Sequence, residues 1–92
     1  MNDSTPLKII KEFLIEEGKY LSREGKAMEA RCEGDTWQNF LIVNSLTCLV
    51  NLLVEISNFA NNEEYVQAWE RVVMYQKGKG LYQESVKMLE NT

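Results

Sequence analysis

The sequence predicts an all-α fold, an antiparallel bundle of three long helices. Apolar residues recur at helical spacing in three segments, and glycine, proline, aspartate and asparagine mark the ends of these segments. The 92 residues form one domain, residues 1–92. A domain of this size buries only about 60–65% of its unfolded surface, so we expect oligomerisation to complete its core.

The first predicted helix begins at Thr5-Pro6 and ends near Gly34. Thr5 can cap the helix, and proline suits the first helical position because its missing N–H would be unpaired there. Gly18 and Gly25 lie inside the helix, seven residues apart. They are either tolerated surface glycines or a smooth groove that a second helix or a ligand approaches. The apolar side of the helix contains Leu7, Ile10, Leu14, Leu21 and Met28.

The second predicted helix runs from Thr36 to Ala60, after a capping box that begins at Asp35. No charged residue occurs from Thr36 to Val54, and apolar side chains surround most of the helix. Its polar residues form one stripe, which we interpret as the strip that faces water; asparagines that fix the register between paired copies, or a polar pocket, are the alternatives. A membrane span is not favoured, because such polar groups are costly in lipid. The stripe consists of Asn44, Thr47, Asn51, Glu55 and Asn58.

The third predicted helix begins around Asn61–Glu64, where an asparagine would cap it. Its apolar seam is interrupted only by Lys79. Because the seam keeps its phase across Gly78 and Gly80, we expect one long helix with a weak point there; a short fourth helix after Gly80 is the alternative. The seam consists of Tyr65, Ala68, Val72, Tyr75, Lys79, Tyr82, Val86 and Leu89.

Composition excludes several kinds of chemistry. The chain has 14 acidic and 10 basic residues, for a net charge of −4, and does not favour a nucleic-acid partner. It has no histidine, which excludes Ser/His/Asp triads and histidine-ligated metals. The N-terminus shows no signal peptide, so we expect a cytoplasmic protein with two free thiols, Cys32 and Cys48. We expect no cofactor and no bound metal.

One weak resemblance concerns carboxylates. Glu16 and Glu17 on the first helix and Glu55 on the second resemble part of the motif of MazG-type nucleotide pyrophosphohydrolases, in which paired acids on two helices hold Mg²⁺. Asn58 and Tyr20 stand where that family's pattern would need further acids. The resemblance implies a Mg²⁺-dependent hydrolase as a third hypothesis, whereas a solvated charged face is the simpler interpretation.

A second hypothesis concerns the local basic cluster around Gly78 and Gly80. Glycine-rich backbone beside lysines can hold a phosphate, although the spacing is not that of a Walker loop. The domain would then bind a small anionic, nucleotide-like ligand. The candidate ligand-binding residues are Lys77, Lys79, Arg71 and Tyr82.

The leading hypothesis is a small acidic protein that is not an enzyme and acts through protein–protein contact. The second helix carries more apolar surface than two neighbours can cover, so we expect a homodimer or higher oligomer and, in addition, another protein partner. Compact acidic helical proteins of this size are frequent among phage and mobile-element accessory factors, including inhibitors of host defence. The candidate interface residues are Leu49, Leu53, Trp69 and Tyr75.

Overall fold

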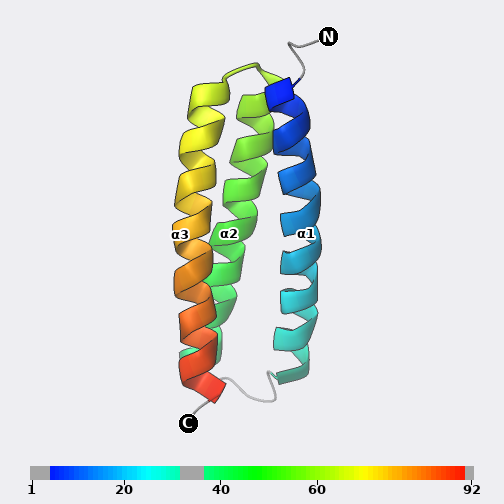
Figure 1. Ribbon diagram of the computed structural model, residues 1–92. Helices are drawn as coiled ribbons and strands as arrows, with labels where there is room; N and C mark the ends of the chain where they lie inside the picture. The colour runs from blue at the N-terminus through cyan, green and yellow to red at the C-terminus, as the bar shows by residue number, and fades with distance from the viewer. Residues whose placement is uncertain (1–4, 32–36, 91–92) are drawn as a thin grey trace.

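The protein forms three long α-helices in the computed structural model (Figure 1). The structure describes residues 5–31 and 37–90, with the side chains of residues 5–30 and 40–88. The helices are α1 (Thr5–Arg31), α2 (Trp37–Asn61) and α3 (Tyr65–Glu90). Helices α1 and α3 run in the same direction, and α2 runs between them in the opposite direction. The predicted all-α bundle of three helices is therefore confirmed.

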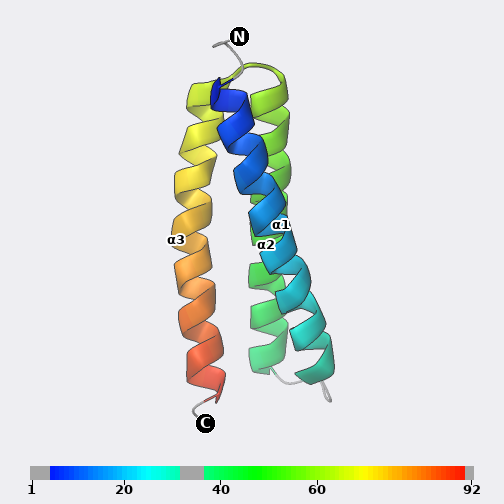
Figure 2. The same cartoon turned by 45° about the vertical axis from the view of Figure 1, so that its right-hand side comes forward.

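The bundle is long and narrow, with principal-axis extents of 50, 19 and 18 Å. Helix α1 is inclined to α3, and the two diverge toward the C-terminal end of α1 (Figure 2). Helix α2 lies against both, so it forms the centre of the packing. The core contains residues from all three helices: Ile10, Leu21, Met28, Ile42, Leu46, Leu49, Ile56, Ala60, Ala68, Val72, Tyr75 and Tyr82.

Helix α3 continues through Gly78 and Gly80 without a break, as the phase of its seam predicts. The two glycines have different surroundings. A Cβ atom added at Gly78 would lie 3.1 Å from Cδ2 of Leu49 on α2, whereas one added at Gly80 would meet nothing within 4 Å. Gly78 therefore marks a close approach of α3 to α2, and Gly80 is an exposed glycine with no packing role.

The turn between α2 and α3 differs from the prediction. The N–H of Glu64 donates to the carbonyl oxygen of Phe59 and the N–H of Glu63 donates to that of Ala60, which is the hydrogen-bond pattern of a Schellman motif. Glu63 occupies the left-handed position, with φ of 61°. The carbonyl of Glu64 then accepts from the N–H of Ala68, so Glu64 caps α3. The prediction of an asparagine cap is wrong, because this motif carries the chain two residues farther before α3 begins.

Several sequence features lie outside the described residues. These are Cys32, the predicted helix end at Gly34, and the predicted cap at Asp35 with Thr36. The side chains of Trp37, Gln38 and Leu89 also lie outside the described set, although their backbone is helical.

The two glycines of α3 provide a matched test of the close approach. Replacing a mid-helix glycine by alanine raises helix stability by about 1 kcal/mol where space permits. We expect Gly80→Ala to raise the melting temperature by about 4–8 °C, the shift that 1 kcal/mol produces in a domain of this size. Gly78→Ala should give a clearly smaller gain or a loss, because its methyl group would press on Leu49. Equal gains in thermal denaturation would contradict the close approach.

Candidate functional site

The outward side of α2 combines exposed apolar residues with a near absence of charge. Only 22% of the most apolar 18-residue stretch within the segment Phe40–Asn61 is buried. The five stripe residues are all exposed on the single chain, which agrees equally with a strip that faces water and with one that faces a second copy. Apolar residues on both sides of the stripe are exposed as well, by 43–57% of their surface. We define the α2 face as Asn44, Thr47, Asn51, Glu55 and Asn58 together with Phe40, Leu41, Val43, Val50 and Val54.

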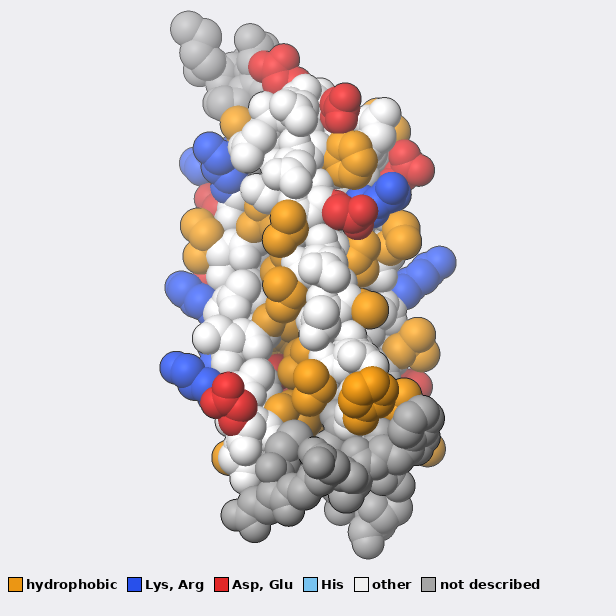
Figure 3. Space-filling model, turned by 180° about the vertical axis from the view of Figure 1, so that it is seen from behind, with side chains coloured by type: hydrophobic (Ala, Val, Ile, Leu, Met, Phe, Trp, Pro, Cys, Tyr) orange, Lys and Arg blue, Asp and Glu red, His pale blue; other side chains and the backbone are white. Residues whose placement is uncertain are grey.

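The α2 face is almost free of charge. Figure 3 shows a band of apolar and uncharged polar side chains along the middle of this side, with lysine and arginine at its two margins. Its single charged residue, Glu55, forms an ion pair with Arg71 of α3, in which Nε and Oε2 are 3.5 Å apart. Exposed apolar surface with charge confined to its margins is typical of a protein contact surface.

A hollow between α1 and α2 extends the α2 face toward α1. Its volume is about 520 Å³. On the α1 side, Gly25 leaves an open space, because a Cβ atom added there would meet nothing within 4 Å. On the α2 side, Val43, Thr47 and Val50 belong both to the hollow and to the α2 face. The lining is otherwise formed by Leu21, Met28, Glu29 and Leu46.

Helix α2 is also long and apolar enough to cross a membrane, by length and hydropathy alone. Two observations argue against that interpretation. The three asparagines and Glu55 point outward from the bundle, where lipid would surround them. The core side of α2 is packed against α1 and α3, both of which carry charged residues along their length, so α2 could not enter a bilayer without leaving the bundle.

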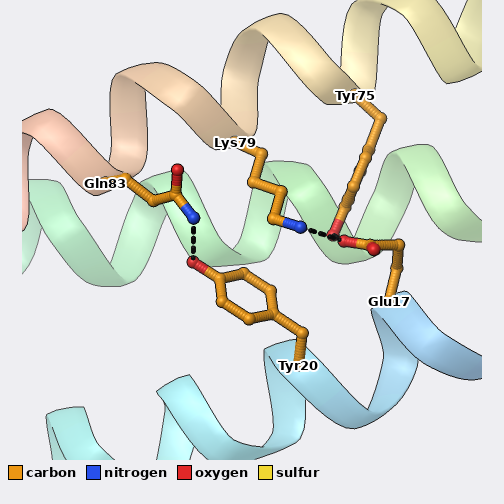
Figure 4. A network of polar contacts seen from close by, with 5 residues as sticks. All are labelled: Glu17, Tyr20, Tyr75, Lys79 and Gln83. Carbon is orange, nitrogen blue, oxygen red and sulfur yellow. Dashed lines mark hydrogen bonds and ion pairs between the residues drawn. The ribbon is translucent and has the colours of Figure 1, made fainter.

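A network of polar contacts joins α1 to α3 on another side of the bundle (Figure 4). Oε1 of Glu17 accepts a hydrogen bond from the hydroxyl of Tyr75 and forms an ion pair with Nζ of Lys79, both at 2.8 Å. Nζ of Lys79 also lies 4.4 Å from the ring centroid of Tyr20. The amide of Gln83 donates to the hydroxyl of Tyr20 over 3.2 Å. Every member of the network therefore has a partner within the chain.

The contact between Glu17 and Tyr75 recurs two turns farther along. The hydroxyl of Tyr82 donates to Oε1 of Glu24 at 2.8 Å, and both tyrosine–glutamate pairs are separated by 58 residues in sequence. The rings of Tyr75 and Tyr82 are buried, while their hydroxyl groups reach across to α1. Two identical contacts one heptad apart fix the register of α3 against α1.

Within the network, the phenol of Tyr75 is held in its neutral form. Burial raises the pKa of the Tyr75 phenol well above its usual range, and the hydrogen bond to Glu17 raises it further. A phenol held neutral in this way donates a hydrogen bond and is a poor base or nucleophile near neutral pH.

The four candidate ligand-binding residues do not come together. Lys79 faces α1 in the network, and the hydroxyl of Tyr82 is bound to Glu24. Arg71 faces α2, where its guanidinium lies 5.5 Å from the ring centroid of Phe59. Lys77 is exposed. The hollow of about 620 Å³ beside Tyr82 is lined by Glu24 and Glu84 as well as Lys87, so its charge does not favour an anion.

The acids of the MazG-type resemblance are also dispersed. Glu17 is bound to Lys79 and Tyr75, Glu55 is paired with Arg71, and Glu16 pairs with Lys19 over 3.7 Å at the surface. Among the described residues, no group of three or more acidic or cysteine side chains could hold a metal ion.

The candidate interface residues lie in three different environments. Leu49 and Tyr75 are 2% and 0% exposed inside the single chain, so neither has surface left for another protein. Leu53 is half-buried against the core, and Trp69 is 56% exposed on α3. Leu49 is a core residue because α3 approaches α2 closely at Gly78 and covers that side of α2. The ring of Tyr75 packs edge-to-face against Phe13 of α1.

Sequence reasoning did not find the partners of Lys79, Tyr75 and Tyr82. A signal was present, since Glu17 and Glu24 are seven residues apart and so are Tyr75 and Tyr82. Matching seven-residue spacings on two helices indicate paired contacts when the helices run in parallel.

Comparison of the chain with protein-family models, with curated protein sequences and with solved structures found no match in any of the three.

The shared acceptor Glu17 should contribute strongly to stability. Hydrogen bonds to charged groups contribute about 1.5–3 kcal/mol each, and Glu17→Ala would leave both Tyr75 and Lys79 without an acceptor. We expect Glu17→Ala to lower the free energy of unfolding by about 3 kcal/mol in urea denaturation. The matched control Glu16→Ala, which breaks only the exposed pair with Lys19, should cost about 0–1 kcal/mol. Similar losses for both variants would contradict the role assigned to Glu17.

The raised pKa of Tyr75 predicts a loss of stability in alkali. The unfolded chain releases the phenol proton near the ordinary tyrosine pKa of about 10, whereas the folded chain retains it, so this stabilisation is present below about pH 10 and is lost as the pH rises above it. We expect the urea midpoint of the unmodified protein to fall more steeply than that of Tyr75→Phe between about pH 9 and pH 11. Parallel curves would show that Tyr75 does not retain its proton on folding.

Proposed function

We propose that this domain is an interaction module that is not an enzyme and acts by docking its α2 face on another protein surface. The observation that carries the proposal is the exposure of that face. Five large apolar side chains of α2 stay 43–57% exposed although three helices are folded together. Exposed apolar side chains gathered on one side of a helix often mark a protein interaction site.

The shape of the surface supports the same proposal. The α2 face runs along the outside of α2, and the hollow beside Gly25 and Val50 adds a depression along its α1 edge. A helix from another protein can lie along such a surface, with its apolar side chains against the valines of α2. The asparagines in the stripe would supply hydrogen bonds that orient the partner.

The polar groups elsewhere support an interaction role less directly. The strongest cluster, around Glu17, consists of side chains that bind one another and join α1 to α3. These contacts join α1 to α3 and involve no residue of the outward side of α2. In this proposal the domain is an accessory or inhibitor protein of a phage or other mobile element and acts in the cytoplasm.

Site-specific photo-cross-linking tests the proposal in the cells that produce the protein. We expect a photoreactive amino acid at Val50 to form covalent adducts with protein on illumination, because Val50 lies on the α2 face. The matched control is the same amino acid at Val66, an exposed valine of α3 that is not part of the face. Equal adduct formation at both positions, or none at Val50, would contradict the proposal.

A charge on the face should then abolish the contact. Val54→Glu, added to the Val50 probe, would bury an unpaired carboxylate in the interface, and a penalty of about 3 kcal/mol weakens binding by more than 100-fold. We expect the adducts at Val50 to disappear with Val54→Glu and to persist with Val66→Glu. Circular dichroism of both variants would confirm that the helices are retained.

A further inference from the structure

The polar stripe of the α2 face has an internal symmetry. Asn44 and Asn58 lie seven residues on either side of Asn51, and Thr47 and Glu55 lie four residues on either side of it. All five residues are exposed on the same side of α2. Asn51 also lies at the middle of the apolar segment Phe40–Asn61. When the helix is reversed end to end about Asn51, the stripe residues therefore occupy the same positions along its axis.

We propose that a second copy of this chain occupies the α2 face, with the two α2 helices antiparallel about a two-fold axis at Asn51. The inference rests on the proposed function and names its partner. In this arrangement Asn44 lies opposite Asn58 of the second copy, and Asn51 lies opposite Asn51 of the second copy. An isologous contact of this kind needs a self-complementary surface, and the symmetry of the stripe supplies one.

The chemistry of each pair fits the antiparallel arrangement. An asparagine side chain has both a donor and an acceptor, so two facing amides satisfy each other. Thr47 lies at the same level along the axis as Glu55 of the second copy but toward the opposite edge of the face, so no like charge faces Glu55 there. The hydroxyl of Thr47 keeps its acceptor within the chain, the carbonyl oxygen of Val43 at 3.0 Å. Arg71 remains beside Glu55 and balances its charge.

A parallel pair fits less well. It would place Glu55 opposite Glu55 of the second copy, and two like charges would face each other as water is excluded. The antiparallel pair separates these two carboxylates by eight residues along the axis, which is about 12 Å at the rise of an α-helix.

The apolar edges of the face agree with the same axis. Val50 and Val54 lie within one turn of Asn51 and are 46% and 53% exposed. The two-fold axis keeps each edge of the face beside the same edge of the second copy, so the four valines of the pair gather next to the central asparagines. Their burial would supply the apolar part of the contact. Polar pairs at the centre of an apolar seam set the register, as a core asparagine does in coiled coils.

Disulfide trapping tests both the partner and the direction. In a chain carrying Cys32→Ser and Cys48→Ser, we expect Asn51→Cys to form a covalent dimer on mild oxidation at micromolar concentration. Chains with Asn44→Cys alone, or with Asn58→Cys alone, should stay uncross-linked, because the two sulfur atoms would be about 21 Å apart along the axis. A mixture of the two, one carrying a size tag, should form the mixed dimer. Lys26→Cys on the outer side of α1 is the control for random collision.

The outcomes separate this inference from the proposed function. Self-cross-linking of Asn44→Cys, or an Asn51→Cys yield no higher than that of Lys26→Cys, would overturn the antiparallel pair. One chain per particle in light scattering of the unmodified protein at the same concentration would also overturn it. In those cases adducts of another mass at Val50 would still support docking of the α2 face on a different protein, whereas absence of any adduct would remove both.

Discussion

The structure depends on a limit of geometry: in a bundle of three helices, each helix has only two neighbours. Helices α1 and α3 also expose apolar side chains, among them Ile15 of α1 and Trp69 and Leu81 of α3, but charged residues lie between these along both helices. Helix α2 has no charged residue before Glu55, so apolar residues inevitably occupy its outward side as well. The same helix thus supplies core residues such as Ile56, with 0% exposure, and surface residues such as Val54, with 53%. The α2 face is the direct result of that division.

The two interfaces of α3 are built in different ways. Against α2, the backbone comes close, and Gly78 provides the space that Leu49 fills. Against α1, the helices are bridged by long side chains, with Tyr75 and Tyr82 extending to Glu17 and Glu24. The aromatic rings fill the space between the helices, and one edge-to-face contact joins Phe13 to Tyr75 at 5.6 Å. Hydroxyl groups at the far end of buried rings restrict the register more narrowly than apolar contacts do, because each needs one acceptor at one position.

Under the proposed function, stability and recognition lie on different sides of the molecule. The network around Glu17 is satisfied within the chain and holds α1 to α3. The α2 face has the opposite character, since its apolar groups are left uncovered and its asparagines are exposed to solvent. Substitutions in the network should change the free energy of unfolding, whereas substitutions on the α2 face should change association. The ion pair between Arg71 and Glu55 links α3 directly to the edge of the face.

The sequence by itself determined the three helices, the seam of α3, the continuity of α3 through Gly78 and the exposed stripe of α2. These features follow from periodicity and end signals within single segments, which are local properties. Only the tertiary structure decided that Lys79 meets Glu17, that Arg71 turns to α2, and that Leu49 and Tyr75 lie in the core. The physical reason is that contacts between helices depend on how each is rotated and shifted against its neighbour, and spacing within one helix does not specify either. The apolar surface of α2 was readable from the start, but which part of it stays uncovered depended on where α1 and α3 pack.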